Sequence, residues 1–159
     1  MGFFTRKDKT EKILAPQSGK AVSITEVPDP VFSGKVIGDG VGIQPNSGEV
    51  FAPVSGTVVQ VAHTLHAIGL ESDDGVEVLV HLGIDTVKLK GEGFTCHVKE
   101  GQHVNAGDKL MDMDLDLIAD RGFSTVSPCI ITNLDSVKDL QIFPGDAVAG
   151  ETAVITYRK

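Results

Sequence analysis

The sequence has few cysteines and no long apolar run, and each shortage narrows the range of functions. Its 159 residues contain two cysteines, Cys96 and Cys129, whose separation is not that of a metal-binding pair. Reduced thiols in a cytoplasmic protein are the simplest interpretation, so the expected location is cytoplasmic. No run approaches the ~20 apolar residues of a membrane-spanning helix, and no secretory h-region precedes a cleavage site. We therefore expect no direct membrane span.

Positive charge is also scarce, with 14 Lys and Arg against 22 Asp and Glu and a formal net charge of −8. This balance argues against a nucleic-acid partner. Long stretches of helical periodicity are missing too, whereas 18 glycines accompany many valines and isoleucines. The predicted fold is therefore all-β: a single-domain antiparallel β-sandwich or flattened barrel with tight turns and at most short helices.

Repeated segments predict an internal pseudo-repeat. Residues 15–22, Ala-Pro-Gln-Ser-Gly-Lys-Ala-Val, recur as residues 52–59, Ala-Pro-Val-Ser-Gly-Thr-Val-Val, and each predicts a turn that leads into a strand. Residues 101–110 and 144–152 resemble each other loosely, and we interpret each as a hairpin. Residues 112–121 are expected to form one short helix, capped by an aspartate, either Asp112 or Asp114.

The predicted domain spans residues 13–159 and follows a flexible N-terminal tail, residues 1–12. The tail is polar but contains Phe3 and Phe4 beside Arg6 and two lysines. Two interpretations of it stay open: a frayed terminus, or a short segment that contacts an anionic membrane surface.

The most informative stretch is a predicted strand over residues 76–85, Val-Glu-Val-Leu-Val-His-Leu-Gly-Ile-Asp. Because side chains alternate between faces, four aliphatic residues share the core face. The other face carries His81 together with Leu79, Gly83 and Asp85. A histidine opposite an unbroken aliphatic face is expected to point outward from the core.

A second predicted strand, residues 64–71, precedes it, and the Asp-Gly step between them indicates a hairpin. If the turn is centred on Asp73-Asp74, His66 lies directly opposite His81. If it is centred one residue later, His66 is the diagonal neighbour. Both registers keep the imidazoles on one face, roughly 5–8 Å apart at Cβ. Thr64 is expected on the same strand face as His66.

Two imidazoles on one strand face suit two functions. Neutral ring nitrogens bind metals. Alternatively, one ring attacks a phosphoryl group while the other donates a hydrogen bond to its oxygens. Gly83 leaves room for a group to approach, and Asp85 is placed to orient a ring or to bind a metal. A cross-strand pair with no chemistry is the third interpretation.

Residues 80–94, Val-His-Leu-Gly-Ile-Asp-Thr-Val-Lys-Leu-Lys-Gly-Glu-Gly-Phe, resemble the active-site signature of the glucose-family enzyme IIA of the bacterial phosphoenolpyruvate:sugar phosphotransferase system. The resemblance implies that His81 carries a phosphoryl group, that His66 stabilises that group and that Thr64 orients the second ring. The Gly-Asp-Gly segment around Asp39 is similar to a family motif near the active site. This implies an electrostatic role for Asp39, with a simple turn residue as the alternative.

As a member of this family, the chain would be a phosphocarrier. The resemblance implies that His81 Nε2 accepts a phosphoryl group from phospho-HPr and passes it to the cysteine of a membrane-associated IIB domain. The backbone near Gly83 would hold the other ring nitrogen. The implied apolar docking surface consists of Val41, Leu79 and Val87. Regulation by phosphorylation state occurs in the family, but the sequence locates no second partner and does not specify the sugar.

Two other classes of protein share parts of this pattern. Residues 100–110 are similar to strands of biotinyl and lipoyl carrier domains, but the modified-lysine motif of those domains is missing. His81 and Asp85 have the His-x-x-x-Asp spacing of a zinc-peptidase family that also needs a His-x-His pair, which this chain lacks. We expect no cofactor in the isolated chain. His66 and His81 would hold zinc only if a partner supplied a further ligand.

Overall fold

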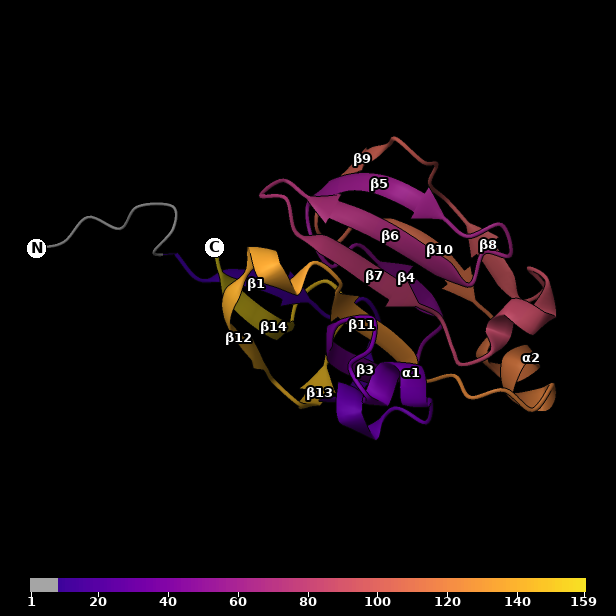
Figure 1. Cartoon of the computed structure of the whole chain (residues 1–159). Coiled ribbons are helices and arrows are strands. Elements are labelled where there is room, and N and C mark those ends of the chain that lie inside the picture. Colours follow the sequence, from indigo (N-terminus) through magenta and orange to yellow (C-terminus); the bar gives the residue numbers. More distant parts are fainter. Residues whose placement is uncertain (1–8) are drawn as a thin grey trace, which may run out of the picture.

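The computed structural model describes residues 9–159 and shows an all-β sandwich (Figure 1). Its largest sheet has eight strands in the order β13-β2-β3-β11-β7-β6-β5-β9. In chain order their bounds are β2 Gly19–Ser23, β3 Asp39–Pro45, β5 Gly56–Val61, β6 Ala67–Ser72, β7 Glu77–His81, β9 His103–Val104, β11 Ser127–Ile131 and β13 Gly145–Ala147. Within the described residues, every strand pairing is antiparallel.

Two three-stranded sheets complete the sandwich. One has the order β1-β14-β12 and the other the order β4-β10-β8. Their bounds are β1 Glu11–Leu14, β4 Glu49–Phe51, β8 Phe94–Cys96, β10 Lys109–Met113, β12 Lys138–Ile142 and β14 Ala153–Arg158. The helices are short: α1 Pro30–Ser33, α2 Leu115–Asp120 and the 3-10 turns η2 Ile24–Glu26, η3 Thr86–Leu89 and η4 Leu134–Ser136.

The predicted pseudo-repeat is visible in the strand pairing. The order of the large sheet places β13-β2-β3-β11 on one side of its centre and β9-β5-β6-β7 on the other. The two Ala-Pro turns make matching hydrogen bonds: Ala15 N–H donates to Thr152 O at 2.8 Å, and Ala52 N–H donates to Asp108 O at 2.7 Å. Each turn leads into a strand, β2 or β5, as the sequence predicts. The centre of this arrangement is the β11–β7 pair, which ends at His81.

The main core lies between the sheets and is aliphatic. It includes the inward side chains of β7 and β6, and all of β11 is buried. A smaller cluster lies on the outer face of the large sheet, where Ile24, Val27 and Phe32 cover Ile130 and Ile84. The η2–α1 segment therefore covers part of the sheet face that the sequence suggested was open. Figure 1 shows α1 beside β3 and β11.

Four segments differ from the sequence-based expectations. β1 begins at Glu11, inside the predicted tail, because Glu11 and Lys12 pair with β14; residues 1–8 lie outside the described part of the chain. Residues 101–110 and 144–152 are not hairpins, since β9 pairs with β5, β13 with β2, and β10 and β14 with the small sheets. The helix is shorter than residues 112–121, and Asp114 caps it by accepting from Leu117 N–H at 3.1 Å. Asp112 lies in β10.

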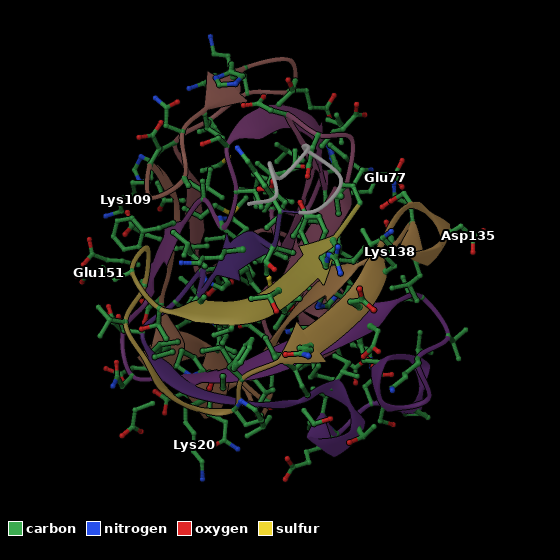
Figure 2. All side chains as sticks on the ribbon, turned by 90° about the vertical axis from the view of Figure 1, so that its left-hand side faces the viewer. Lys20, Glu77, Lys109, Asp135, Lys138 and Glu151 are labelled. Carbon is green, nitrogen blue, oxygen red and sulfur yellow. The ribbon has the colours of Figure 1, made fainter. Side chains whose placement is uncertain are left out.

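Charged side chains lie on the outside of the sandwich. Figure 2 labels six of them, namely Lys20, Glu77, Lys109, Asp135, Lys138 and Glu151. Among residues 9–159, no helix is long and apolar enough to cross a membrane.

Candidate active site

His81 is the last residue of β7, and the strand's alternation turns its ring to the outer face of the large sheet. Val80 and Leu82 on either side are fully buried, whereas His81 is half-buried. The ring of Phe32 contacts it, with centroids 5.0 Å apart and planes tilted by 59°. Phe32 is held there by the short helix α1, whose Pro30 occupies the first turn and whose Asp29 is the N-cap.

One hydrogen bond determines which nitrogen of His81 is free. Nδ1 lies 2.7 Å from the carbonyl oxygen of Gly83. A carbonyl oxygen only accepts, so Nδ1 carries the proton and the lone pair of the neutral ring is on Nε2. Gly83 is able to place its carbonyl here because its φ is +79°, a conformation that glycine adopts without strain. The sequence-based expectation of a backbone hold near Gly83 agrees with this geometry.

His66 reaches the site by a different route from the predicted one. Ala67 pairs with His81, so the observed register lies one residue away from each predicted register. A slip of one residue reverses the faces of a strand, but β6 begins only at Ala67. His66 lies in the preceding turn, where Leu65 has a φ of +62°. The turn brings the two rings edge to face, with centroids 5.0 Å apart.

Thr64 lies in the same turn and not on a strand face, contrary to the prediction. It nevertheless contacts the ring it was expected to orient: its Oγ1 is 2.6 Å from His66 Nδ1. When the hydroxyl donates to Nδ1, His66 carries its proton on Nε2. That nitrogen is then a hydrogen-bond donor beside His81.

Burial lowers the pKa of both histidines from the ordinary value of 6.5. For His66 the second cause is the neighbouring His81, because two positive rings repel. For His81 the hydrogen bond to Gly83 and the carboxylates of Asp29 and Asp85 raise the pKa, but burial outweighs them. Both rings are therefore mainly neutral at pH 7.

The sequence suggested two carboxylates near His81, those of Asp85 and Asp39, and only Asp85 is among the carboxylates that act on the ring. Asp85 raises the pKa of His81 from a left-handed position (φ +62°) at the N-cap of η3, whereas its expected role in orienting a ring or binding a metal stays a prediction. Asp39 lies two strands away in the sheet, with Ile131 of β11 between it and Val78. Its carboxylate contacts Lys35 at 3.4 Å and Gly40 N–H at 2.8 Å. The second carboxylate that acts on His81 is Asp29.

The predicted docking surface is also changed. Val41 is fully buried in the core, because it lies on the inner face of β3, so it offers no exposed surface. Val87 is 49% exposed, and Leu79 is partly buried against the cluster under α1. Sequence reasoning missed the apolar residues that α1 and the following turn expose, which are Val31, Val36 and Ile37. The Asp-Pro step at residues 29–30 is a helix-start signal that would have located them.

A metal at the histidine pair would need a further ligand from outside this chain. Among residues 9–159, no group of three or more His, Cys, Asp or Glu side chains is arranged to hold a metal ion. The pair of His66 and His81 supplies two nitrogens, whereas a structural zinc site takes four ligands. Zinc bound together with a ligand from a partner stays a prediction.

Comparison with known proteins identifies the family. Residues 11–137 match the family described as phosphoenolpyruvate-dependent sugar phosphotransferase system, EIIA 1. The chain belongs to this EIIA family. It is 49% identical over 150 residues to the PTS system glucose-specific EIIA component of Bacillus anthracis, covering 94% of this chain and 91% of that protein. It is 46% identical over 154 residues to the component of the same name from Buchnera aphidicola, covering 97% and 94%.

A solved structure agrees with the EIIA assignment. The glucose permease IIA from Mycoplasma capricolum superposes with a TM-score of 0.88 at 42% identity, covering 98% of this chain and 99% of that chain. The predicted family and the predicted all-β fold are thus confirmed.

Proposed function

We propose that this EIIA protein is a phosphocarrier that accepts a phosphoryl group on Nε2 of His81. Phospho-HPr is the donor, and the acceptor in the next step is the cysteine of a membrane-associated IIB domain. The observation that carries the proposal is the hydrogen bond from His81 Nδ1 to Gly83 O. It leaves Nε2 of the neutral ring unprotonated, with its lone pair free, which is what a nucleophile requires.

The transfer is an in-line exchange at phosphorus. The bond between Nε2 and phosphorus forms while the bond between phosphorus and the donor atom breaks. The electron pair of the broken bond stays on the donor atom, so nothing is oxidised or reduced. His81 must be neutral to attack, and its lowered pKa supports this at pH 7. Phosphoryl transfer is mainly positioning and electrostatic stabilisation. Nε2–H of His66 would supply the stabilising hydrogen bond to the transferred oxygens.

The surroundings of His81 favour transient docking of proteins over binding of a small substrate. The ring of Phe32 packs against His81, and Val31 beside Phe32 and Val87 two residues after Asp85 are exposed apolar side chains. An exposed apolar surface suits a short-lived protein contact. The relatives are named glucose-specific, so we propose glucose as the sugar of the system.

Two further features follow from this proposal. A carrier that meets HPr and the inner face of a permease would work in the cytoplasm. The site would also alternate between an uncharged and a strongly anionic state, and this change of charge is the basis we propose for any regulation of other proteins.

The test is phosphorylation in a purified system. The protein is mixed with phosphoenolpyruvate, enzyme I and HPr, and its intact mass is recorded before and after brief acid treatment. We expect one acid-labile phosphoryl group on the unsubstituted protein and on His103→Gln, a control for an exposed histidine far from the site. We expect none on His81→Ala. His66→Gln should accept the group but pass it on slowly. Absence of any mass gain in the unsubstituted protein would refute the proposal.

A further inference from the structure

Two successive peptide units follow His81 in the loop, and hydrogen bonds hold both the carbonyl and the N–H of each unit. The carbonyl of the Gly83–Ile84 unit accepts from His81 Nδ1, and its N–H donates to Ser124 O at 3.0 Å. The preceding unit, Leu82–Gly83, is held by two side-chain hydroxyls. Thr86 Oγ1 donates to Leu82 O at 2.6 Å, and Gly83 N–H donates to Ser127 Oγ at 3.2 Å. Ser127 thus holds the N–H of Gly83, and the carbonyl of the same residue accepts the proton of His81.

Ser127 is itself held firmly in the structure. It is the first residue of β11, and it is fully buried between β3 and the end of β7. Its hydroxyl donates to Thr125 O at 3.0 Å, so its lone pairs face the Gly83 N–H. Gly83 has no side chain of its own with which to resist movement. Its position depends on these backbone contacts and on the packing of Thr86 beside it.

We propose that Ser127 is a positioning residue for phosphoryl transfer, because it holds the Gly83 peptide in the place where its neighbouring carbonyl locks the proton of His81 on Nδ1. The inference rests on the proposed function of His81. Ser127 does not touch the phosphoryl group. It acts through Gly83, and Thr86 supports the same peptide unit from its carbonyl side.

Loss of the hydroxyl would leave a buried N–H without a partner. A buried donor in that state is costly, so the loop is expected to shift until Gly83 N–H finds water or another acceptor. Movement of the Leu82–Gly83 unit rotates the next unit, which carries the carbonyl bonded to His81. The proton would then no longer be confined to Nδ1, and a fraction of the rings would present Nε2–H, which is not a nucleophile.

The experiment compares three variants with the unsubstituted protein. Ser127→Ala removes the acceptor, and Ser127→Thr keeps it. The matched control is Ser72→Ala, because Ser72 is also buried and also accepts a backbone N–H, that of Val76 at 2.8 Å. Ser72 lies at the other end of the same hairpin. Long-range proton–nitrogen NMR spectra of the imidazoles, taken at about pH 8 where a ring of ordinary pKa is neutral, report the tautomer without any phosphorylation. Thermal unfolding shows that each variant is folded, and the initial rate of phosphorylation by phospho-HPr is measured in parallel.

We expect Ser127→Ala to lose the pure Nδ1–H pattern of His81 and to be phosphorylated about threefold to tenfold more slowly, the loss expected for one hydrogen bond. Ser127→Thr should restore both, and Ser72→Ala should change only the unfolding temperature. A folded Ser127→Ala with an unchanged tautomer and rate would overturn the proposal, as would an equal effect in Ser72→Ala.

A fourth variant, Thr86→Val, keeps the proposal testable if Ser127→Ala does not fold. Thr86→Val keeps the shape of the side chain and removes the donor to Leu82 O, so it should disturb the same peptide and the same tautomer. An unchanged tautomer in Thr86→Val would count against the proposal. If the unsubstituted protein accepted no phosphoryl group, the proposed function would fail, whereas the tautomer comparison would still decide the role of Ser127.

Discussion

Replacement of Gly83 by alanine is the substitution whose effect is most directly determined by the site geometry. The backbone at Gly83 has a φ of +79°. A Cβ added there would lie 2.6 Å from Thr86 Cγ2 and 2.9 Å from Ser124 O. Neither neighbour is free to move, because Thr86 is fully buried and donates to Leu82 O, and Ser124 O accepts Ile84 N–H.

The expected cost of this substitution has two parts. A left-handed backbone costs a residue with a side chain roughly 1–2 kcal/mol. Overpacking against fixed neighbours adds about 1–3 kcal/mol. Gly101 separates the two parts, because it has a similar φ of +89° but nothing within 4 Å of the added Cβ. Gly101→Ala should therefore lose only the first part of the free energy of unfolding, and Gly83→Ala should lose both.

Denaturant unfolding of both variants, followed by circular dichroism, measures these free energies, and the phosphorylation rate is measured on the folded protein. Gly83→Ala should be less stable than Gly101→Ala by about 1–3 kcal/mol. It should also be phosphorylated more slowly, since the strained loop displaces the carbonyl that holds His81. Equal destabilisation by the two variants, or a normal rate in Gly83→Ala, would refute this account of the loop.

Three further predictions concern titrating groups. Asp29→Asn should lower the pKa of His81 in an NMR titration, because this carboxylate raises it, whereas Asp39→Asn should leave it unchanged; the reverse result would restore the sequence-based assignment. The free energy of unfolding should fall as the pH drops below 6.5, the ordinary histidine pKa, because the unfolded chain takes up protons there and the two site rings, whose pKa values are lowered, do not. Stability that was constant between pH 7.5 and 5.5 would contradict this sign. Burial raises the pKa of the Cys129 thiol to about 12, so a thiol reagent should label Cys96 in the native protein and label Cys129 only after unfolding.

Most of the fold could be predicted from local patterns. Alternation located β7 and its core face, and the Ala-Pro turns located β2 and β5 together with the pseudo-repeat. The strand partners could not be obtained in this way. Residues 101–110 have the composition of a hairpin, but β9 and β10 pair with strands more than 40 positions earlier in the chain. Such long-range pairing is set by packing of the whole sandwich.

The sequence predicted that two histidines form the candidate site, but it did not predict the strand register and the turn that bring them together. The register of the β6–β7 hairpin depends on the number of residues in its turn, and here the turn is one residue away from both expectations. His66 still reaches His81, because Leu65 takes a left-handed conformation that no alternation rule anticipates. The prediction of Val41 as a docking residue, which rested on the family resemblance, was wrong, because Val41 is fully buried in the core. The faces of a glycine-rich strand such as β3 are hard to assign without a clear alternation of polar and apolar residues.

Asp29 was not predicted, because the Gly-Asp-Gly segment placed the site aspartate at Asp39. In the sequence both aspartates are plausible turn residues, and only the folded arrangement distinguishes them. The short helix α1 brings Asp29 and Phe32 over the outer face of the sheet, whereas Asp39 starts a strand two positions away from β7.

The most direct test of the central claim is to determine which atom carries the phosphoryl group. The protein labelled with nitrogen-15 is phosphorylated by phospho-HPr, and long-range proton–nitrogen NMR spectra are recorded with phosphorus-31 detection of the bonded nitrogen. The account predicts a single phosphorylated ring, that of His81, with phosphorus on Nε2 and the proton kept on Nδ1. Phosphorus on Nδ1 of His81, or on His66, would contradict it.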